Sequence, residues 1–188
     1  MTMSVWAAVG KSKAAWMSLS LDSRMREASS LLLGWRYRWS SSPTCRPFSG
    51  ALTASFTGTD RTIYCSGMTI VMLCAVCPDA SWDSRSYGDL QCFADRLPDH
   101  PDSPIDAVVR AGIGTRVTDT DATGWYLCQG WWSLGAKPAG HAVLLYRDSS
   151  GLLWVLQSAS GIGPTYGLAT KSPEEQFTAG VYYARLAA

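Results

Sequence analysis

The stretch from Cys65 to Val76, CSGMTIVMLCAV, contains no charged residue and is followed closely by Pro78. Because proline cannot continue a helix, this run predicts a helix that begins near Cys65 and ends near Val76. The run is apolar on nearly all sides, so we expect this helix to be central and buried. It is too short for a membrane span, which needs roughly 18–20 apolar residues. The rest of the chain must therefore cover this helix.

Helical patterns precede strand patterns along the chain. Ser20 to Leu33 has a capping residue, Ser20 or Asp22, and Gly34 at its end. Its apolar side chains fall near one face: Leu21, Met25, Ala28, Leu32 and Leu33. PIDAVVRAG predicts a short helix that ends at Gly112, and a further short helix is possible around Tyr87 to Arg96. Between the first of these helices and the one that begins at Cys65, the Ser-, Gly- and Pro-rich residues 35–60 predict a long loop with at most a short strand.

The C-terminal third is rich in β-branched and aromatic residues. Four runs, GWYLCQGWW, HAVLLYR, LLWVLQSAS and GVYYARL, predict antiparallel strands, and RDSSG predicts the hairpin turn between the second and third. Helices followed by a sheet indicate an α+β fold, with N-terminal helices packed on a C-terminal antiparallel sheet. The length of 188 residues suits one domain, 1–188, with residues 1–19 as an N-terminal extension.

Charge and composition exclude several functions. The formal net charge is +1 and only 16% of the residues are charged, so the chain lacks the basic surface of a nucleic-acid-binding protein. The N-terminal residues lack the order of charges and apolar residues that a secretory signal has, so we expect synthesis in the cytoplasm without Sec export. We also expect no contact with a membrane and no nucleotide site.

The six cysteines allow several roles for Cys65. It could be a buried apolar residue, half of a disulfide, a metal ligand or a nucleophile at the start of a helix. Cys74 and Cys77 have the C-x-x-C spacing of redox and zinc motifs, but no second pair with that spacing exists. This favours buried thiols that pack as small apolar groups, and we expect neither a metal ion nor a cofactor.

Cys65 and a histidine could form a catalytic pair. The dipole and N–H groups at a helix N-terminus favour a thiolate, and His141 opens a predicted strand far downstream. A histidine can hold the thiolate and protonate a leaving amine, although a strand histidine can also be merely structural. A third group on the next strand, Gln157 or Ser158, would orient the imidazole. We favour Gln157, because its amide oxygen reaches further, but the strand register decides.

These residues resemble the NlpC/P60 family of papain-like cysteine peptidases, which cleave bacterial cell-wall peptides. The matching segments are MREASSLLLGWRYRW, YCSGMTIVML and GHAVLLYRDSSGLLWVLQSAS, which together span roughly Asp22 to Ser160. Tyr64 stands where the family usually has aspartate, and Gln157 stands where histidine is common. The resemblance implies a papain-like fold, a catalytic Cys65 and His141, and an oxyanion or substrate site that includes Tyr37, Trp39 and Ser66.

The resemblance implies a cysteine amidohydrolase that cleaves peptidoglycan stem peptides through a thioester. Trp131 and Trp132 either line a substrate groove or pack in the core. The expected protein is a monomer that acts on the cell wall, through phage release or effector delivery, with an immunity or delivery protein as a further partner. Two alternatives are an acyltransferase or deamidase with another substrate, and a wall-binding module in which Cys65 is only structural.

Overall fold

The computed structural model describes residues 5–36, 65–80, 103–132 and 139–187, and all structural statements concern these ranges. In chain order the elements are α1 (Val5–Ala8), α2 (Lys13–Met17), α3 (Leu21–Ser30), α5 (Cys65–Val76), α6 (Pro104–Arg110), β1 (Gly114–Val117), β2 (Gly124–Trp132), β3 (Ala139–Arg147), β4 (Leu153–Ala159), β5 (Gly163–Leu168), α7 (Pro173–Gln176) and β6 (Gly180–Leu186).

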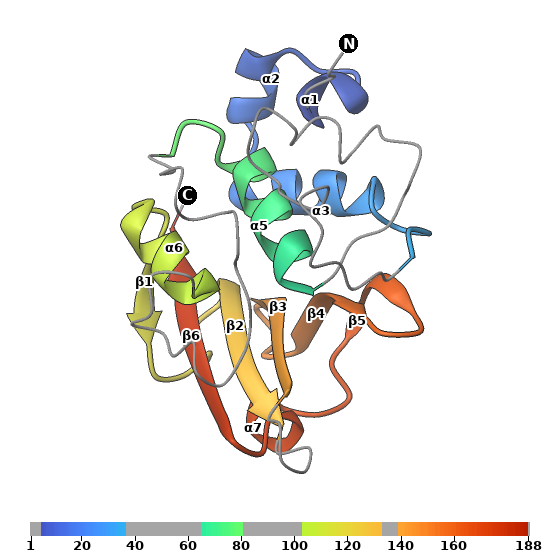
Figure 1. Ribbon diagram of the computed structural model, residues 1–188. Coiled ribbons are helices and arrows are strands. Elements are labelled where there is room, and N and C mark those ends of the chain that lie inside the picture. Colours follow the sequence, from blue (N-terminus) through green and yellow to red (C-terminus); the bar gives the residue numbers. More distant parts are fainter. Residues whose placement is uncertain (1–4, 37–64, 81–102, 133–138, 188) are drawn as a thin grey trace.

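Within the described ranges, six strands form one antiparallel sheet in the order β1-β6-β2-β3-β4-β5. The sheet is open, with β1 and β5 at its edges. Figure 1 shows helices α1, α2, α3 and α5 gathered on one side of the molecule and the strands on the other. The architecture is therefore α+β, with N-terminal helices packed against a C-terminal sheet, as the sequence predicted.

Helix α5 lies at the centre of this arrangement, and it begins and ends where the sequence predicted. It contacts α3 on one side and strands β3 and β4 on the other (Figure 1). The side chains of Met68, Met72 and Leu73 are fully buried in the main core, which also contains Leu144 of β3. No helix in the described part of the chain combines the length and apolar character needed to cross a membrane.

The opposite face of the sheet has a second, smaller core. Along β3 the side chains alternate between the two cores: Leu144 belongs to the α5 side, whereas Val143 and Leu145 belong to the other. Phe177, the residue after α7, is buried in this second core. The sheet is thus covered on both faces, and His141 shares the parity of Val143 and Leu145.

Helix α3 confirms the predicted cap and shows one error in the predicted buried face. The Ser20 hydroxyl accepts a hydrogen bond from the backbone N–H of Ser23, so Ser20, not Asp22, is the capping residue. The helix gives way to turns that reach Gly34, which has a positive φ of 84°. Leu32 is fully buried, but Leu33 is 52% exposed. The prediction for Leu33 is wrong because the helix ends before it and the chain turns away.

The N-terminal residues form part of the domain core. Trp16, on α2, is fully buried and donates a hydrogen bond from Nε1 to the carbonyl oxygen of Ala75 on α5, at 3.0 Å. Val5 on α1 is also buried. Trp16 therefore lies at the C-terminal end of α5, and residues 5–17, which the sequence suggested only as part of an extension, contribute side chains to the main core.

The remaining predicted elements have mixed outcomes. The four predicted strands are β2, β3, β4 and β6, and the predicted RDSSG turn joins β3 to β4. The helix that ends at Gly112 is α6. Strands β1 and β5 were not predicted from the sequence. The helix suggested around Tyr87 to Arg96 and most of the predicted loop 35–60 lie outside the described residues.

Candidate active site

Cys65 is the first residue of α5, and its side chain is only 3% exposed. The thiol is not part of a disulfide. The first N–H groups of a helix have no carbonyl partner within the helix, and together with the helix dipole they favour negative charge. The N–H groups at the start of α5 therefore offer a thiolate at Cys65 a stabilisation that opposes the cost of its burial.

His141 lies near the start of β3, directly opposite Gly130 on β2, and is 5% exposed. A hydrogen bond joins its imidazole to the side chain of Cys65. Cys65 and His141, which are 76 positions apart in the sequence, thus meet where the N-terminus of α5 approaches the start of β3. The predicted contact between them is confirmed, while the catalytic role of the pair stays a prediction.

Gln157 completes a chain of three side chains. Its Oε1 lies 3.1 Å from His141 Nε2. Because Nε2 is engaged by Gln157, we assign the contact with Cys65 to the other ring nitrogen, Nδ1. An amide oxygen can only accept, so Gln157 favours the tautomer with hydrogen on Nε2 and a lone pair on Nδ1. That tautomer can accept the Cys65 proton.

The strand register explains why Gln157 and not Ser158 contacts His141. Arg147 pairs with Leu153 across a five-residue turn, 148–152, and Leu144 pairs with Leu156. This odd-length turn gives Gln157 the same parity as His141, so the two side chains lie on the same face of the sheet. The same register, continued, sets Gln157 diagonal to His141 and not directly opposite it. Ser158 is fully buried and has the other parity.

The pKa of His141 is raised above its ordinary value of 6.5 by opposing effects. Burial is the largest effect and lowers the pKa, because the imidazolium loses contact with water. The hydrogen bond and the negative charge of Cys65 raise it, and the hydrogen bond to Gln157 raises it further. The net direction favours the imidazolium form of His141 more than in an ordinary histidine, and perturbed groups of this kind gather at functional sites.

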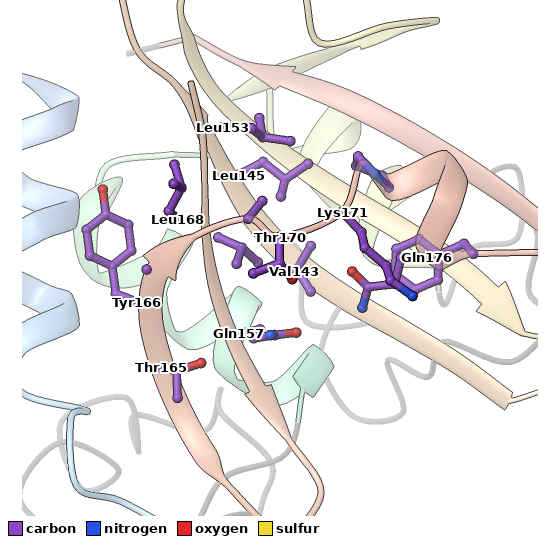
Figure 2. Close-up of a pocket in the computed structure, with 15 residues that line it drawn as sticks. Val143, Leu145, Leu153, Gln157, Thr165, Tyr166, Leu168, Thr170, Lys171 and Gln176 are labelled. Atoms are coloured by element: carbon purple, nitrogen blue, oxygen red, sulfur yellow. The ribbon is translucent and has the colours of Figure 1, made fainter. Parts of the chain in front are cut away.

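A cavity of about 260 Å³ lies beside Gln157, on the sheet face away from α5. Its apolar wall comes from β3 and β4, with Val143, Leu145 and Leu153 among its residues. Figure 2 shows the Gln157 amide with Thr165 of β5 on one side and Gln176 of α7 on the other. Gln157 thus joins the His141 site to this cavity.

The other described cysteines differ from Cys65. Burial raises the pKa of both Cys74 and Cys128 well above the usual value, and it also raises that of Cys77. None of these three thiols is part of a disulfide. Within the described ranges no group of three or more His, Cys, Asp or Glu side chains could hold a metal ion. Because their pKa values are raised, these three cysteines are poor nucleophiles at neutral pH.

The structure leaves the other predicted site residues as predictions. Tyr37 and Trp39 lie outside the described residues, and the side chains of Ser66 and Trp132 are not described. Trp131 is 2% exposed and packs against the ring of Tyr182, which favours a packing role.

Two residues beside the site, Phe177 on the sheet face away from α5 and Gly130 on β2, were not predicted from the sequence. Phe177 packs against His141, with ring centroids 6.3 Å apart, and its ring lies on Gly130. One signal for this contact exists in the sequence. A glycine inside a strand, as in GWYLCQGWW, often marks the close approach of another group.

Replacing Gln157 by alanine should lower turnover by about 10–100-fold, the cost found when a group that orients a metal-ligating histidine is lost. The imidazole would keep its contact with Cys65 but lose its fixed tautomer. Ser158→Ala is the matched control, because it removes a neighbouring polar group of the other parity, and we expect turnover within about twofold of wild type. Initial rates and thermal melts of both variants test this. A larger loss in Ser158→Ala would contradict the assigned register.

Comparison of the chain with protein-family models, with curated proteins and with solved structures found no match.

Proposed function

We propose that this protein is a papain-like cysteine hydrolase of the NlpC/P60 type that cleaves an amide bond in peptidoglycan stem peptides. The observation on which the proposal rests is the chain of contacts from Cys65 through His141 to Gln157 at the N-terminus of a buried helix. The motif resemblance supports the substrate class. The open α+β arrangement of helices and sheet is compatible with the papain-like fold that the resemblance implies.

The proposed first half-reaction begins with proton transfer. His141 Nδ1 takes the proton of the Cys65 thiol, and the thiolate attacks the carbonyl carbon of the scissile amide. A C–S bond forms and the carbonyl oxygen becomes an oxyanion, which the backbone N–H of Cys65 stabilises, with the hydroxyl of Tyr37 as a further predicted donor. When the C–N bond breaks, the imidazolium returns the proton to the departing amine.

In the proposed second half-reaction, His141 removes a proton from water and the resulting hydroxide attacks the thioester carbon. A second oxyanion collapses, the C–S bond breaks, and the products are a free carboxylate and a regenerated Cys65. Gln157 keeps the imidazole in one orientation throughout. An acyltransferase would share the first half-reaction and use an amine in place of water, and a deamidase would release ammonia.

Digestion of purified peptidoglycan tests the proposal. We expect fragments with one new amine and one new carboxylate at a single type of amide bond, identified by mass spectrometry. Activity should survive EDTA and disappear after treatment with iodoacetamide. Intact substrate after prolonged incubation would overturn the proposed substrate class, and transfer of the acyl group to an added amine without hydrolysis would favour the acyltransferase.

Alkylation separates the enzyme from a wall-binding module in which Cys65 is only structural. At mildly acidic pH, Cys65 should react well before Cys74 and Cys128, because burial keeps the latter two protonated. Peptide mapping by mass spectrometry locates the adduct. His141→Ala should remove this selectivity, since the imidazolium that stabilises the thiolate is lost. Equal, slow reaction of all these cysteines in the wild type would support the binding module.

A further inference from the structure

We propose that Phe177 is a positioning residue that holds the imidazole of His141 in place, and that position 130 must be glycine to admit it. This inference rests on the proposed function for its kinetic consequences but not for its spectroscopic ones. The observations that support it come from three segments: the end of α7, the middle of β2 and the start of β3.

The segment that contains Phe177 is fixed on both sides. At its N-terminal side, α7 begins with a capping box, in which Ser172 and Glu175 exchange two hydrogen bonds of 2.8 and 3.2 Å. The N–H of Phe177 then donates to the carbonyl oxygen of Pro173 at 2.8 Å. Beyond it, the N–H of Ala179 donates to the carbonyl oxygen of Trp131 at 3.0 Å. Backbone contacts thus hold the Phe177 ring against the sheet.

The ring occupies the space that a side chain at position 130 would need. A Cβ atom added to Gly130 would lie 2.2 Å from Phe177 Cγ and 2.4 Å from its Cδ2. Side chains cannot approach so closely, so any larger residue at position 130 must displace the aromatic ring. Gly130 is also the residue paired directly with His141. The glycine therefore brings Phe177 beside the imidazole, where it is 4% exposed.

The imidazole of His141 has two kinds of contact, hydrogen bonds at its edge and the packing of the Phe177 ring. Cys65 from α5 and Gln157 from β4 bind the ring nitrogens, and these bonds direct the ring within its own plane. Phe177 packs at an angle of 47° to that plane, with centroids 6.3 Å apart. It therefore limits the tilting that two hydrogen bonds at the ring edge leave possible. A tilted ring would present Nδ1 poorly to the thiol.

Phe177 lies close to the neighbouring cavity as well as to the imidazole. The same side chain lines the cavity of about 260 Å³ beside Gln157. Truncating it would extend this cavity toward His141 and admit water. The charged partner of the imidazole is Cys65, whereas Gln157, Phe177 and Gly130 carry no charge. Because burial lowers the pKa of His141, admitting water should raise it.

The test uses Phe177→Ala, with Leu145→Ala as a matched control. Leu145 lines the same cavity, belongs to the same small core and is also buried, so its truncation loosens the region without removing the ring beside His141. We expect Phe177→Ala to lower kcat by about 10–100-fold with KM within about twofold, and to raise the pKa of His141. Leu145→Ala should change neither. The inference fails if a folded Phe177→Ala leaves both kcat and this pKa unchanged, or if Leu145→Ala changes them equally.

Proton NMR titration measures the pKa without substrate. The chain has two histidines, so only two sets of imidazole signals arise, and His100 serves as the internal reference. If the wild type is inactive and Phe177→Ala still shifts the pKa of His141, the proposed function is overturned but the positioning role is supported. Phe177→Leu provides a second variant if the alanine protein does not fold. It keeps the apolar volume without the flat ring, and we expect smaller changes in the same directions.

A double mutant tests whether Gly130 acts through Phe177. Gly130→Ala alone should displace the ring and reduce kcat about as much as Phe177→Ala does. In Gly130→Ala/Phe177→Ala the new methyl group meets no ring, so the double variant should be no worse than Phe177→Ala alone. Losses that multiply in the double variant would show that the two residues act separately and would overturn the role assigned to Gly130.

Discussion

The Cys65→Ala and His141→Ala proteins should each lose hydrolysis of peptidoglycan by up to about a millionfold, the scale found when a nucleophile or its base is removed. Alanine at position 65 has no atom to form the thioester, and alanine at position 141 leaves no base to take the thiol proton. Because the two residues act as one unit, the double variant should be no less active than either single variant.

The matched control for Cys65→Ala is Cys74→Ala. Both cysteines lie on α5 and both are 3% exposed, so the two variants remove the same atom from equally buried positions on one helix. We expect Cys74→Ala to keep wild-type turnover, and thermal melts to be similar for the two proteins. Wild-type turnover in Cys65→Ala would eliminate the enzyme proposal, and an equal loss in Cys74→Ala would attribute the effect to α5 as a whole.

The same Cys65→Ala protein should show a changed His141 titration. In the wild type the hydrogen bond and charge of Cys65 raise the pKa of His141 against the effect of burial. Alanine removes both contributions and leaves burial, which lowers the pKa, opposed only by Gln157. The imidazolium should therefore lose its proton at lower pH than in the wild type. An unchanged His141 titration would contradict the described contact between the two side chains.

The largest expected loss of stability comes from Gly163→Ala, at the start of β5. Gly163 has a φ of +82°, and an added Cβ would lie 2.3 Å from the carbonyl oxygen of Trp35. The substitution therefore combines a strained backbone with a collision against another backbone segment, which cannot move aside as a flexible side chain can. We expect the free energy of unfolding to fall by about 3 kcal/mol or more.

Gly161→Ala is the control that isolates the collision. Gly161 has nearly the same φ, +83°, but nothing lies within 4 Å of its added Cβ. It should lose only about 1–2 kcal/mol, the cost of the left-handed conformation alone. Urea denaturation of both variants measures the difference. Equal losses would show that the collision with the Trp35 carbonyl oxygen adds no cost to the free energy of unfolding.

Local signals in the sequence were sufficient for several elements. An uninterrupted apolar run and Pro78 gave the bounds of α5, and Ser20 marked the start of α3, although α3 ends at Ser30 and only turns continue to Gly34. Turn residues located the β3–β4 hairpin. These predictions succeeded because caps, breakers and apolar periodicity act between residues a few positions apart.

Short elements and single side-chain positions were less predictable. Helices α1 and α2 have four and five residues, too few to show a helical period, and Trp16 of α2 is held by a bond to Ala75 far along the chain. Strand β5, GPTYGL, contains a proline and two glycines and lacks a clear alternation. Its pairing with β4 stabilises it as a strand, although its own residues do not favour one.

For the candidate site, the sequence by itself determined which residues have the required chemistry. They are a cysteine at a helix N-terminus, a histidine at the start of a strand, and the amide of Gln157 on the next strand. The sequence left the third position open between Gln157 and Ser158, which have opposite parity, and favoured Gln157 for its longer reach. Only the tertiary structure brought Cys65 to His141, set Gln157 diagonal to it, and placed Phe177 over Gly130. Such contacts depend on how α5, the sheet and the segment after α7 pack in three dimensions. Residue type and local periodicity do not encode them, because the partners are separated by tens of residues and meet only when the two cores form.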